Sequence, residues 1–465
     1  MHYNNGILNG TNQAVKMALD TAGNIYVTGF SQNTNTNLGY VTIKYAPNGK
    51  QVWASRYDST NYPAATPSCL VLGASNNAVV TGSAVTVNYD ANGNQLWTAP
   101  YGGSALAVDR NGNIAVTGFD TLFSTVKLNS SGTNLWQETN PSTCGAAMAQ
   151  SIVADTNGNF YVAGNYPGFC ESGVIDYALL LIKYGSNGNQ VWTAAYPYGG
   201  YTWQVEGAFV GASNNLYLVA NITSGFSAEY VGFEYNANGG LVWVTLASNN
   251  SYSRAHAMAI DTNQCVVMTG QVPTSFNPGP VFSCGTIELG TNGSAMWTSL
   301  YPMSATATGV ANAVAVDQAN NVYVTGYSPG TNSINDIVTI KYDNNGNQIW
   351  LQRYSSPGNG NAAGNAIAVD NNGNVYVTGY DTTAAGGTEI VTIKYSPVTL
   401  QRRSDGTVIL QAQGAPGESF DIEASSDLLN WLDLGSVLAD TNGLMQFDDT
   451  NAGKFPARFY TTSPQ

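Results

Sequence analysis

The sequence predicts an all-β protein, a β-propeller of four-stranded blades followed by a small β-sandwich-like domain. Short runs rich in Val, Ile, Thr and Tyr alternate with turns rich in Asn, Asp and Gly, which is typical of strands joined by tight turns. A unit of four such runs recurs along most of the chain. The 51 glycines fit a protein with many turns, and helical periodicity is nearly absent.

The clearest unit covers residues 312–354. It reads as four runs, AVAVD, VYVTGY, DIVTIKY and QIWLQRY, separated by turns and one variable loop. Each run is long enough for one strand, and each turn is short enough for an antiparallel neighbour. The unit is therefore predicted to be a four-stranded meander.

Aligning the chain on the Val-x-Gly of the second strand and the Trp of the fourth strand gives eight copies of the unit. They cover residues 14–57, 68–101, 104–140, 150–196, 206–247, 256–301, 312–354 and 365–395. The second copy is short, because VVTG turns almost directly into AVTVNY. We expect the repeated Trp residues to fill the widening gaps between blades: Trp53, Trp97, Trp136, Trp192, Trp243, Trp297 and Trp350.

The eighth copy has no Trp strand. His2-Tyr3 aligns with Arg353-Tyr354, the end of the seventh copy, so residues 1–3 are expected to supply the outer strand of the last blade. Such a closure ties the two ends of the ring together. It also suggests that native residues, including a secretion signal, preceded Met1. We therefore predict eight blades; the alternative is seven, with the short second copy outside the ring.

The pattern AVDxxGNVYVTGY…DIVTIKYxxNGNQIW resembles the SBBP family of bacterial β-propeller repeats over roughly residues 1–396. The resemblance implies a secreted or surface propeller, and it implies no common activity. The family is usually described as seven-bladed, so the eight copies depart from it.

After Tyr395 the pattern changes, and residues 397–465 read as a separate domain of four to six strands with Trp431 as a core anchor. Its IEASSDLLNW and RFY segments resemble a small C-terminal β-domain of secreted proteins from Verrucomicrobia-like bacteria. That resemblance implies an accessory or sorting module. The predicted domains are thus 1–396 and 397–465.

Composition limits the function. The formal charge is −14 and only 9% of residues are charged, which argues against nucleic acid or an anionic membrane as partner. No apolar run approaches the ~20 residues of a membrane-spanning helix, so no membrane insertion is expected. Only two histidines are present, so neither a histidine-cluster metal site nor an ordinary Ser-His triad is expected.

An Asp follows the first strand of most copies. The segments at residues 155–159 and 370–374 resemble the start of a calcium loop but lack its register and its closing Glu. We interpret them as hairpin turns in which Asp accepts backbone N–H bonds. No cofactor is predicted, although structural calcium stays open.

The five cysteines fit an exported protein. Cys144 precedes the first strand of the fourth copy and Cys170 lies in its second loop, on the same face, so they are a candidate disulfide; unpaired loop thiols are the alternative. Cys265 and Cys284 fall at opposite ends of their strands and should not pair, and Cys69 is expected to be free and buried.

The copies differ where the first strand opens at the upper rim of the channel. The residues there are Val15, Ser68, Ser104, Gln150, Glu206, His256, Asn312 and Asn365. Copies five and six are the ionisable part of this ring, and two divergent loops precede them. Together they give the candidate ligand-binding residues: Tyr198, Tyr201, Trp203, Gln204, Glu206, Tyr252, Arg254 and His256.

Aromatic rings beside carboxylate, guanidinium and amide groups suit a saccharide, because rings cover C–H faces while polar groups bind hydroxyls. The first hypothesis is non-catalytic recognition of a polysaccharide or surface protein at or outside the cell. The alternatives are a structural subunit of an extracellular layer or filament, and a polysaccharide lyase or glycosidase using Glu206 with Arg254, His256 or a Tyr. The loops could also simply pack on each other and seal the rim.

Overall fold

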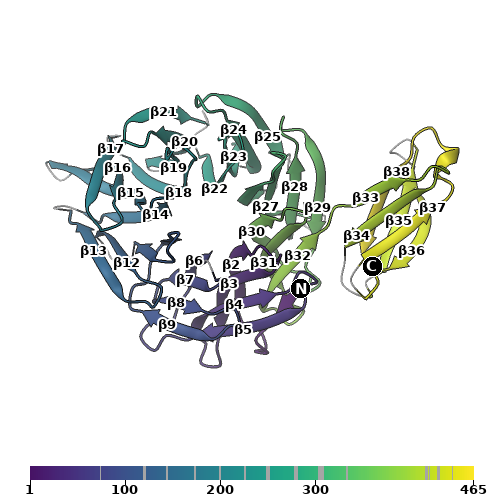
Figure 1. Ribbon diagram of the computed structural model, residues 1–465, viewed down its shortest axis with the longest axis horizontal. Helices are drawn as coiled ribbons and strands as arrows, with labels where there is room; N and C mark the ends of the chain where they lie inside the picture. Colours follow the sequence, from purple (N-terminus) through teal and green to yellow (C-terminus); the bar gives the residue numbers. More distant parts are fainter. Residues whose placement is uncertain are drawn as a thin grey trace.

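The computed structural model describes residues 1–73, 75–118, 122–142, 145–171, 174–197, 201–224, 227–247, 252–276, 281–301, 308–330, 334–413, 417, 419–426, 430–441 and 444–464. Within these ranges the strands form eight four-stranded sheets and two three-stranded sheets. The four-stranded sheets stand around a ring, and the other two lie outside it (Figure 1). The structure is therefore an all-β propeller, and the predicted fold class is confirmed.

Each of the first seven blades is an antiparallel meander, and we number the blades in chain order. Blades one to three contain β2 (Asn12–Leu19), β3 (Ile25–Gln32), β4 (Leu38–Tyr45) and β5 (Gln51–Tyr57); β6 (Pro67–Leu72), β7 (Ala78–Gly82), β8 (Thr86–Tyr89) and β9 (Gln95–Ala99); and β10 (Ala105–Val108), β11 (Ile114–Thr117), β12 (Phe123–Leu128) and β13 (Asn134–Asn140). Blades four and five contain β14 (Met148–Ala154), β15 (Phe160–Glu171), β16 (Val174–Tyr184) and β17 (Gln190–Pro197); and β18 (Thr202–Val210), β19 (Leu216–Ser224), β20 (Ser227–Tyr235) and β21 (Leu241–Leu246).

Blades six and seven contain β22 (Arg254–Ile260), β23 (Val266–Ser275), β24 (Val281–Leu289) and β25 (Ala295–Tyr301); and β26 (Val310–Val316), β27 (Val322–Pro329), β28 (Asn335–Tyr342) and β29 (Gln348–Tyr354). Blade eight joins both ends of the propeller: β30 (Ala363–Val369), β31 (Val375–Thr382), β32 (Thr388–Tyr395) and β1 (His2–Tyr3). β1 pairs antiparallel with β32, with His2 opposite Val391 and Tyr3 opposite Ile390. The expected closure by the first residues is confirmed.

Neighbouring blades are joined by the repeated Trp. The Trp53 indole N–H donates to the carbonyl of Ala91 in the next blade at 3.0 Å. The ring also covers Gly93 of that turn, where a Cβ would lie 2.6 Å from it. The same contact recurs around the ring, for example between Trp136 and Gly188. The Trp residues are packing groups, as predicted.

The Asp after the first strand closes its turn. Asp155 Oδ1 accepts the backbone N–H groups of Asn157 and Asn159, at 2.9 and 3.0 Å, and Oδ2 accepts the Asn159 amide at 2.8 Å. Asp370 makes the same three bonds within its own turn. The hairpin interpretation of these residues is confirmed.

The strands that follow the propeller form two sheets: β33 (Thr399–Arg402), β34 (Val408–Gln413) and β37 (Leu444–Asp449), and β36 (Leu432–Leu438), β35 (Ser419–Ser425) and β38 (Phe459–Pro464). A single 3₁₀ turn, η1 (Ala452–Lys454), precedes β38. The predicted boundary at residues 396/397 falls between β32 and β33, and the independence of the two domains stays a prediction.

Trp431 does not anchor the core of this second unit. Its side chain is 39% exposed, because it lies in the turn before β36 instead of on a strand. The buried cluster is formed by smaller residues from both sheets: Leu410, Ala412, Phe420, Ile422, Ala439 and Met445.

Among the described residues, no helix is both long and apolar enough to span a bilayer. Cys265 and Cys284 are unpaired, as expected, and both are buried. Cys69 is also unpaired but is only half-buried. Cys144 and the side chain of Cys170 lie outside the described residues, so their pairing stays a prediction.

Candidate functional site

The ring positions identified in the sequence are β-bulges. In seven blades the pairing of the first and second strands skips one residue, and in blade three Ser104 stands just before β10. A bulge turns a side chain away from the ladder and so provides a position that can vary without breaking the sheet. The skipped residues are Val15, Ser68, Gln150, Glu206, His256, Asn312 and Asn365.

Most of these side chains join one blade to the next. Ser104 Oγ donates to the Ala149 carbonyl at 2.8 Å, and Asn365 Nδ2 donates to the Ala14 carbonyl at 2.9 Å. Ser68 and Asn312 donate in the same way to carbonyls of blades three and eight, and Gln150 Oε1 accepts the Val205 N–H of blade five. Each partner is the residue that precedes the next ring position, so these side chains are structural.

Blade five departs from this pattern. Asn221 of β19 makes the link instead, because its amide donates to the Ala255 carbonyl at 2.9 Å and accepts the Ala255 N–H at 2.8 Å. The same amide donates to Glu206 Oε1 at 2.8 Å. Glu206 is therefore held in place without being used as a link between blades. The sequence reasoning missed Asn221, which occupies the position of an aromatic residue in other copies, such as Phe30.

Glu206 and His256 both titrate abnormally. Burial raises the pKa of Glu206 to about 7, although the Asn221 amide and the charges of Lys16 and Arg254 act in the opposite direction. Burial, helped by Arg254, lowers the pKa of His256 below its usual value. A poised carboxylate and a neutral imidazole on one rim are typical of functional sites, although structural networks also produce them.

Trp203 does not face a ligand. Its side chain is 2% exposed and packs against Tyr196 and Phe233, each with ring centroids 5.9 Å away. The divergent loop thus uses Trp203 to extend the core between blades four and five. For this residue, the interpretation in which the loops pack on each other is the one that the structure supports.

Unlike Trp203, several other candidate residues of the rim are accessible to solvent. Gln204 and Arg254 are exposed, Tyr201 is half-buried, and Tyr198 lies outside the described residues. Tyr252 is 36% exposed and forms a pair with Phe276, which is 55% exposed, with ring centroids 5.8 Å apart. Phe276 was missed because only loops before first strands were considered, whereas the loop after β23 emerges on the same face.

Tyr252 has an unusual backbone. Its φ is 79°, in the left-handed region that bulky side chains rarely adopt. Such a conformation costs ~1–3 kcal/mol and persists only where the surroundings impose it. The result is a tyrosine ring held beside Phe276 two residues before Arg254.

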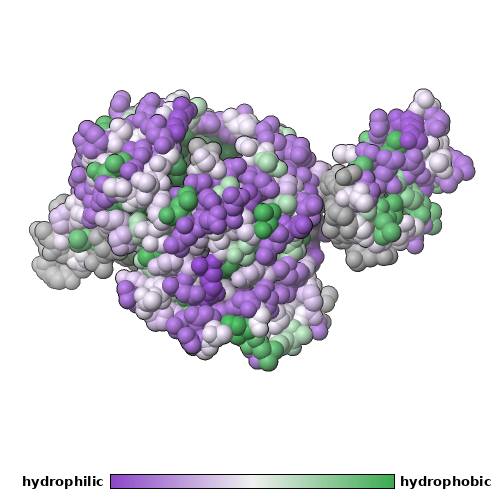
Figure 2. All heavy atoms as spheres, turned by 60° about the horizontal axis from the view of Figure 1, so that its bottom comes forward, coloured by the Kyte–Doolittle hydropathy of each residue, from purple (hydrophilic) through white to green (hydrophobic). Residues whose placement is uncertain are grey.

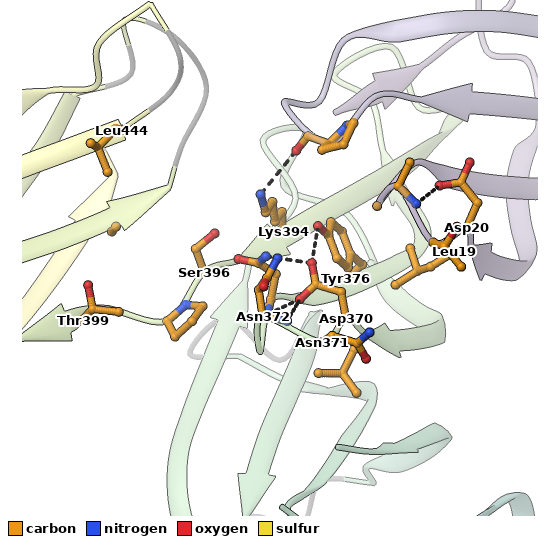
Figure 3. A pocket seen from close by; sticks show the side chains of 18 of the residues that line it. Leu19, Asp20, Asp370, Asn371, Asn372, Tyr376, Lys394, Ser396, Thr399 and Leu444 are labelled. Atoms are coloured by element: carbon orange, nitrogen blue, oxygen red, sulfur yellow. Dashed lines mark hydrogen bonds between the residues drawn. The ribbon is translucent and has the colours of Figure 1, made fainter. Parts of the chain in front are cut away.

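A second concave region lies at the opposite end of the blades (Figure 3). It is a cavity of about 760 Å³ between the turns of blades one and eight and the second unit, where it touches Thr399 and Leu444. Two of its charged groups already have partners: Lys394 Nζ donates to the Pro47 carbonyl at 3.3 Å, and Asp370 closes its own turn. The buried Ser396 hydroxyl, which also lines the cavity, has no hydrogen-bond partner among the described residues. The sequence did not predict this cavity, because it forms between segments far apart in the chain.

One family model matches a short segment of the chain. Residues 349–380 match SBBP, described as a beta-propeller repeat. No curated protein matches the sequence.

Among solved structures, puromycin hydrolase has a TM-score of 0.48 at 8% identity, covering 87% of this chain and 59% of that one. A polysaccharide lyase of the ulvan lyase family PL25 has a TM-score of 0.41 at 10% identity, covering 84% and 96%. A Dyadobacter fermentans protein of unknown function has a TM-score of 0.42 at 8% identity, covering 83% and 95%. These scores are too low to support an argument about function.

Proposed function

For this chain, whose residues 349–380 are an SBBP β-propeller repeat, we propose a role in recognition at or outside the bacterial cell surface. The partner is a polysaccharide, or the glycan of a surface protein, bound at the rim of blades five and six. The exposed Tyr252–Phe276 pair is the observation that carries this proposal.

Stacking explains why this pair suits a sugar. A flat ring covers the C–H face of a pyranose, and two neighbouring rings offer enough area for consecutive sugar units. An aromatic side chain has few rotatable bonds, so little conformational entropy is lost on binding. The left-handed backbone of Tyr252 supports the proposal, because the folded protein already holds the ring in this conformation before a ligand binds.

Polar groups beside the Tyr252–Phe276 pair would orient the bound sugar. The guanidinium of Arg254 donates several parallel hydrogen bonds to hydroxyl or carboxylate oxygens, and the Gln204 amide both donates and accepts. Both side chains are exposed. Arg254 also favours an acidic sugar over a neutral one, since a charge-assisted hydrogen bond is stronger.

The test is a glycan-array and insoluble-polysaccharide binding screen of the whole chain beside Tyr252→Ala. We expect the variant to lose at least about fivefold in affinity, as one stacked ring contributes ~1–2 kcal/mol. Tyr62→Ala is the matched control, because Tyr62 is 51% exposed in the connection between blades one and two and should not affect binding.

Binding that survives Tyr252→Ala and Phe276→Ala together would contradict the rim site. Trp203→Ala is unsuitable as the test, because loss of a buried ring would disturb the fold and mimic loss of a ligand contact.

Catalysis is the second candidate, and it is favoured by the raised pKa of Glu206 in blade five and the lowered pKa of His256 at the equivalent position of blade six. A carboxyl group that titrates near neutral pH can act as a general acid or base. Turnover of acidic polysaccharides that Glu206→Gln abolishes without weakening binding would establish this function, and a complete absence of turnover would exclude it.

Self-assembly into an extracellular layer is the third candidate. An aliphatic residue precedes each repeated Trp, and these side chains are more than half exposed around the outside of the ring. Figure 2 shows that apolar side chains on one face lie in separate patches within a polar surface. Light scattering at rising protein concentration tests this idea, and a persistent monomer would count against it. The exposed residues are Val52, Leu96, Leu135, Val191, Val242, Met296 and Ile349.

A further inference from the structure

The turn between β22 and β23 differs from its equivalents in the other blades. In blade four, three donors approach Asp155 Oδ2: the Asn159 amide at 2.8 Å, the Tyr161 hydroxyl at 3.3 Å and the Lys183 ammonium at 3.7 Å. They come from the turn, the second strand and the third strand, and together they neutralise a buried carboxylate.

Blade six keeps the carboxylate and lacks these three donors, although the Asn263 amide donates to Asp261 Oδ2 at 3.3 Å. Relative to Asp261, the positions of the amide, the hydroxyl and the ammonium hold Cys265, Val267 and Glu288. One oxygen of Asp261, the Cys265 sulfur and one oxygen of Glu288 lie within 4.8 Å of one another. All three residues are buried, with 4–6% of each exposed.

Blade five shows that the fold does not require this arrangement. There Glu234 occupies the lysine position, but Gly211 replaces the Asp, so one carboxylate is present instead of two. The Asn215 amide donates to Glu234 at 2.6 Å. Among the blades that the structure describes, blade six therefore combines two buried carboxylates with no lysine.

Glu288 has no charge partner within the described residues, where it forms no ion pair or hydrogen bond with a side-chain donor. The Trp297 indole N–H lies near enough to lower the pKa of Glu288 but is not in hydrogen-bonding geometry with any acceptor. Two buried carboxylates this close repel each other, and the uptake of a proton or of a cation removes that repulsion.

We propose that Asp261, Cys265 and Glu288 bind a thiophilic divalent cation of the zinc class. Two carboxylates and one thiolate are ligands that zinc accepts together, whereas calcium and magnesium take oxygen ligands and disfavour sulfur. Binding replaces the thiol proton of Cys265 by a sulfur–metal bond and releases that proton to water.

Met296 provides a fourth ligand position and a route of entry. Its sulfur lies 3.8 Å from the Cys265 sulfur, and its side chain is 58% exposed on the outer strand β25. The site lies at the end of β22 that is remote from Arg254, so it is independent of the rim. A cation bound there would connect the first, third and fourth strands of blade six.

The experiment uses the whole reduced chain with Zn²⁺, Co²⁺ or Ca²⁺ added after chelation. We expect saturating Zn²⁺ to raise Tm by about 2–5 °C, Co²⁺ to give a sulfur-to-cobalt charge-transfer band, and Ca²⁺ to do neither. Cys265→Ser should weaken Zn²⁺ binding at least about tenfold and abolish the band. Cys284→Ser is the matched control, because Cys284 is a buried free cysteine of the same blade and lies outside the cluster.

Glu288→Lys gives a second, opposite test. It introduces the lysine that blades one, three, four, seven and eight carry at this position. The variant should therefore have a higher Tm without metal, through a pair with Asp261, and should not respond to Zn²⁺. The proposal is overturned if Zn²⁺ leaves Tm unchanged, or if Cys265→Ser keeps the cobalt band.

Discussion

At the scale of the residue, the bulge position of the first strand links two blades in several copies and holds a carboxylate at the rim in blade five. The bulge residue of the first strand is a link between blades wherever it is Ser, Gln or Asn, as in the bond from Asn365 to Ala14. Glu206 stands in the same place and is held by Asn221, which has taken over the link. A carboxylate that the fold does not need, held at a rim, is available for function.

Glu206 makes the stability of the protein depend on pH. Its pKa is about 7 in the folded chain and 4.5 without burial, so the folded state binds more protons between these values. Stability therefore falls as pH rises through this window. We expect Glu206→Gln to be more stable than the wild type at pH 8 by up to about 3 kcal/mol, and to show no such gain at pH 4.5.

Urea unfolding at the two pH values measures this difference. Glu138→Gln is the control, since Glu138 is exposed on β13 and its replacement should not alter the pH dependence. Equal pH profiles for the wild type and Glu206→Gln would show that Glu206 stays charged at the rim.

At the scale of the element, the turn before the fourth strand of blades two to seven also contacts the tryptophan of the preceding blade. Gly346 has a φ of 80°, and a Cβ there would lie 2.6 Å from the Trp297 ring of the preceding blade. The glycine is thus required both by the turn and by the tryptophan that covers it.

A pair of glycine variants separates these two requirements. Gly112 has a φ of 76°, and a Cβ there would meet nothing within 4 Å. We expect Gly112→Ala to cost about 1 kcal/mol, because alanine in the left-handed region is strained. Gly346→Ala should cost about 2–4 kcal/mol, because the Trp297 ring must also move. Similar losses of unfolding free energy in the two variants would show that the tryptophan contact tolerates the methyl group.

At the scale of the whole molecule, stability depends on closing the ring. Two backbone bonds of 2.8 Å join Met1 and Thr392, and Asn12 of blade one makes three hydrogen bonds to Thr388 of blade eight. Tyr3 packs into the cluster that joins these blades, against residues such as Ile43 and Ile390. The contacts join segments nearly 400 residues apart in the chain.

Tyr3→Ala should open this closure. We expect a loss of about 2–3 kcal/mol, because a half-buried ring that contacts two blades is removed. Chemical unfolding followed by Trp fluorescence measures it, with Tyr62→Ala as a control because Tyr62 is exposed on the surface. Unchanged stability in Tyr3→Ala would mean that the other contacts between blades one and eight hold the ring without it.

The sequence by itself determined the architecture of this protein. Repetition is the reason: each copy carries its own strands, turns and Trp, so the same local pattern is read many times, and an error in one copy is corrected by the others. The Asp turns, the packing role of the Trp residues and the closure through His2 and Tyr3 were all predicted. Trp431 lies outside the repeats, and its expected burial was wrong because no second copy was available for comparison.

Only the tertiary structure decided which candidate residues can meet a ligand. Trp203 and Tyr252 look alike in sequence, since both stand in divergent aromatic loops, yet Trp203 is buried against Phe233 and Tyr252 is exposed beside Phe276. The direction of a side chain depends on which neighbouring blade it meets. The grouping of Asp261, Cys265 and Glu288 is equally invisible in the chain, because hydrogen bonding between strands brings together residues that lie far apart in sequence.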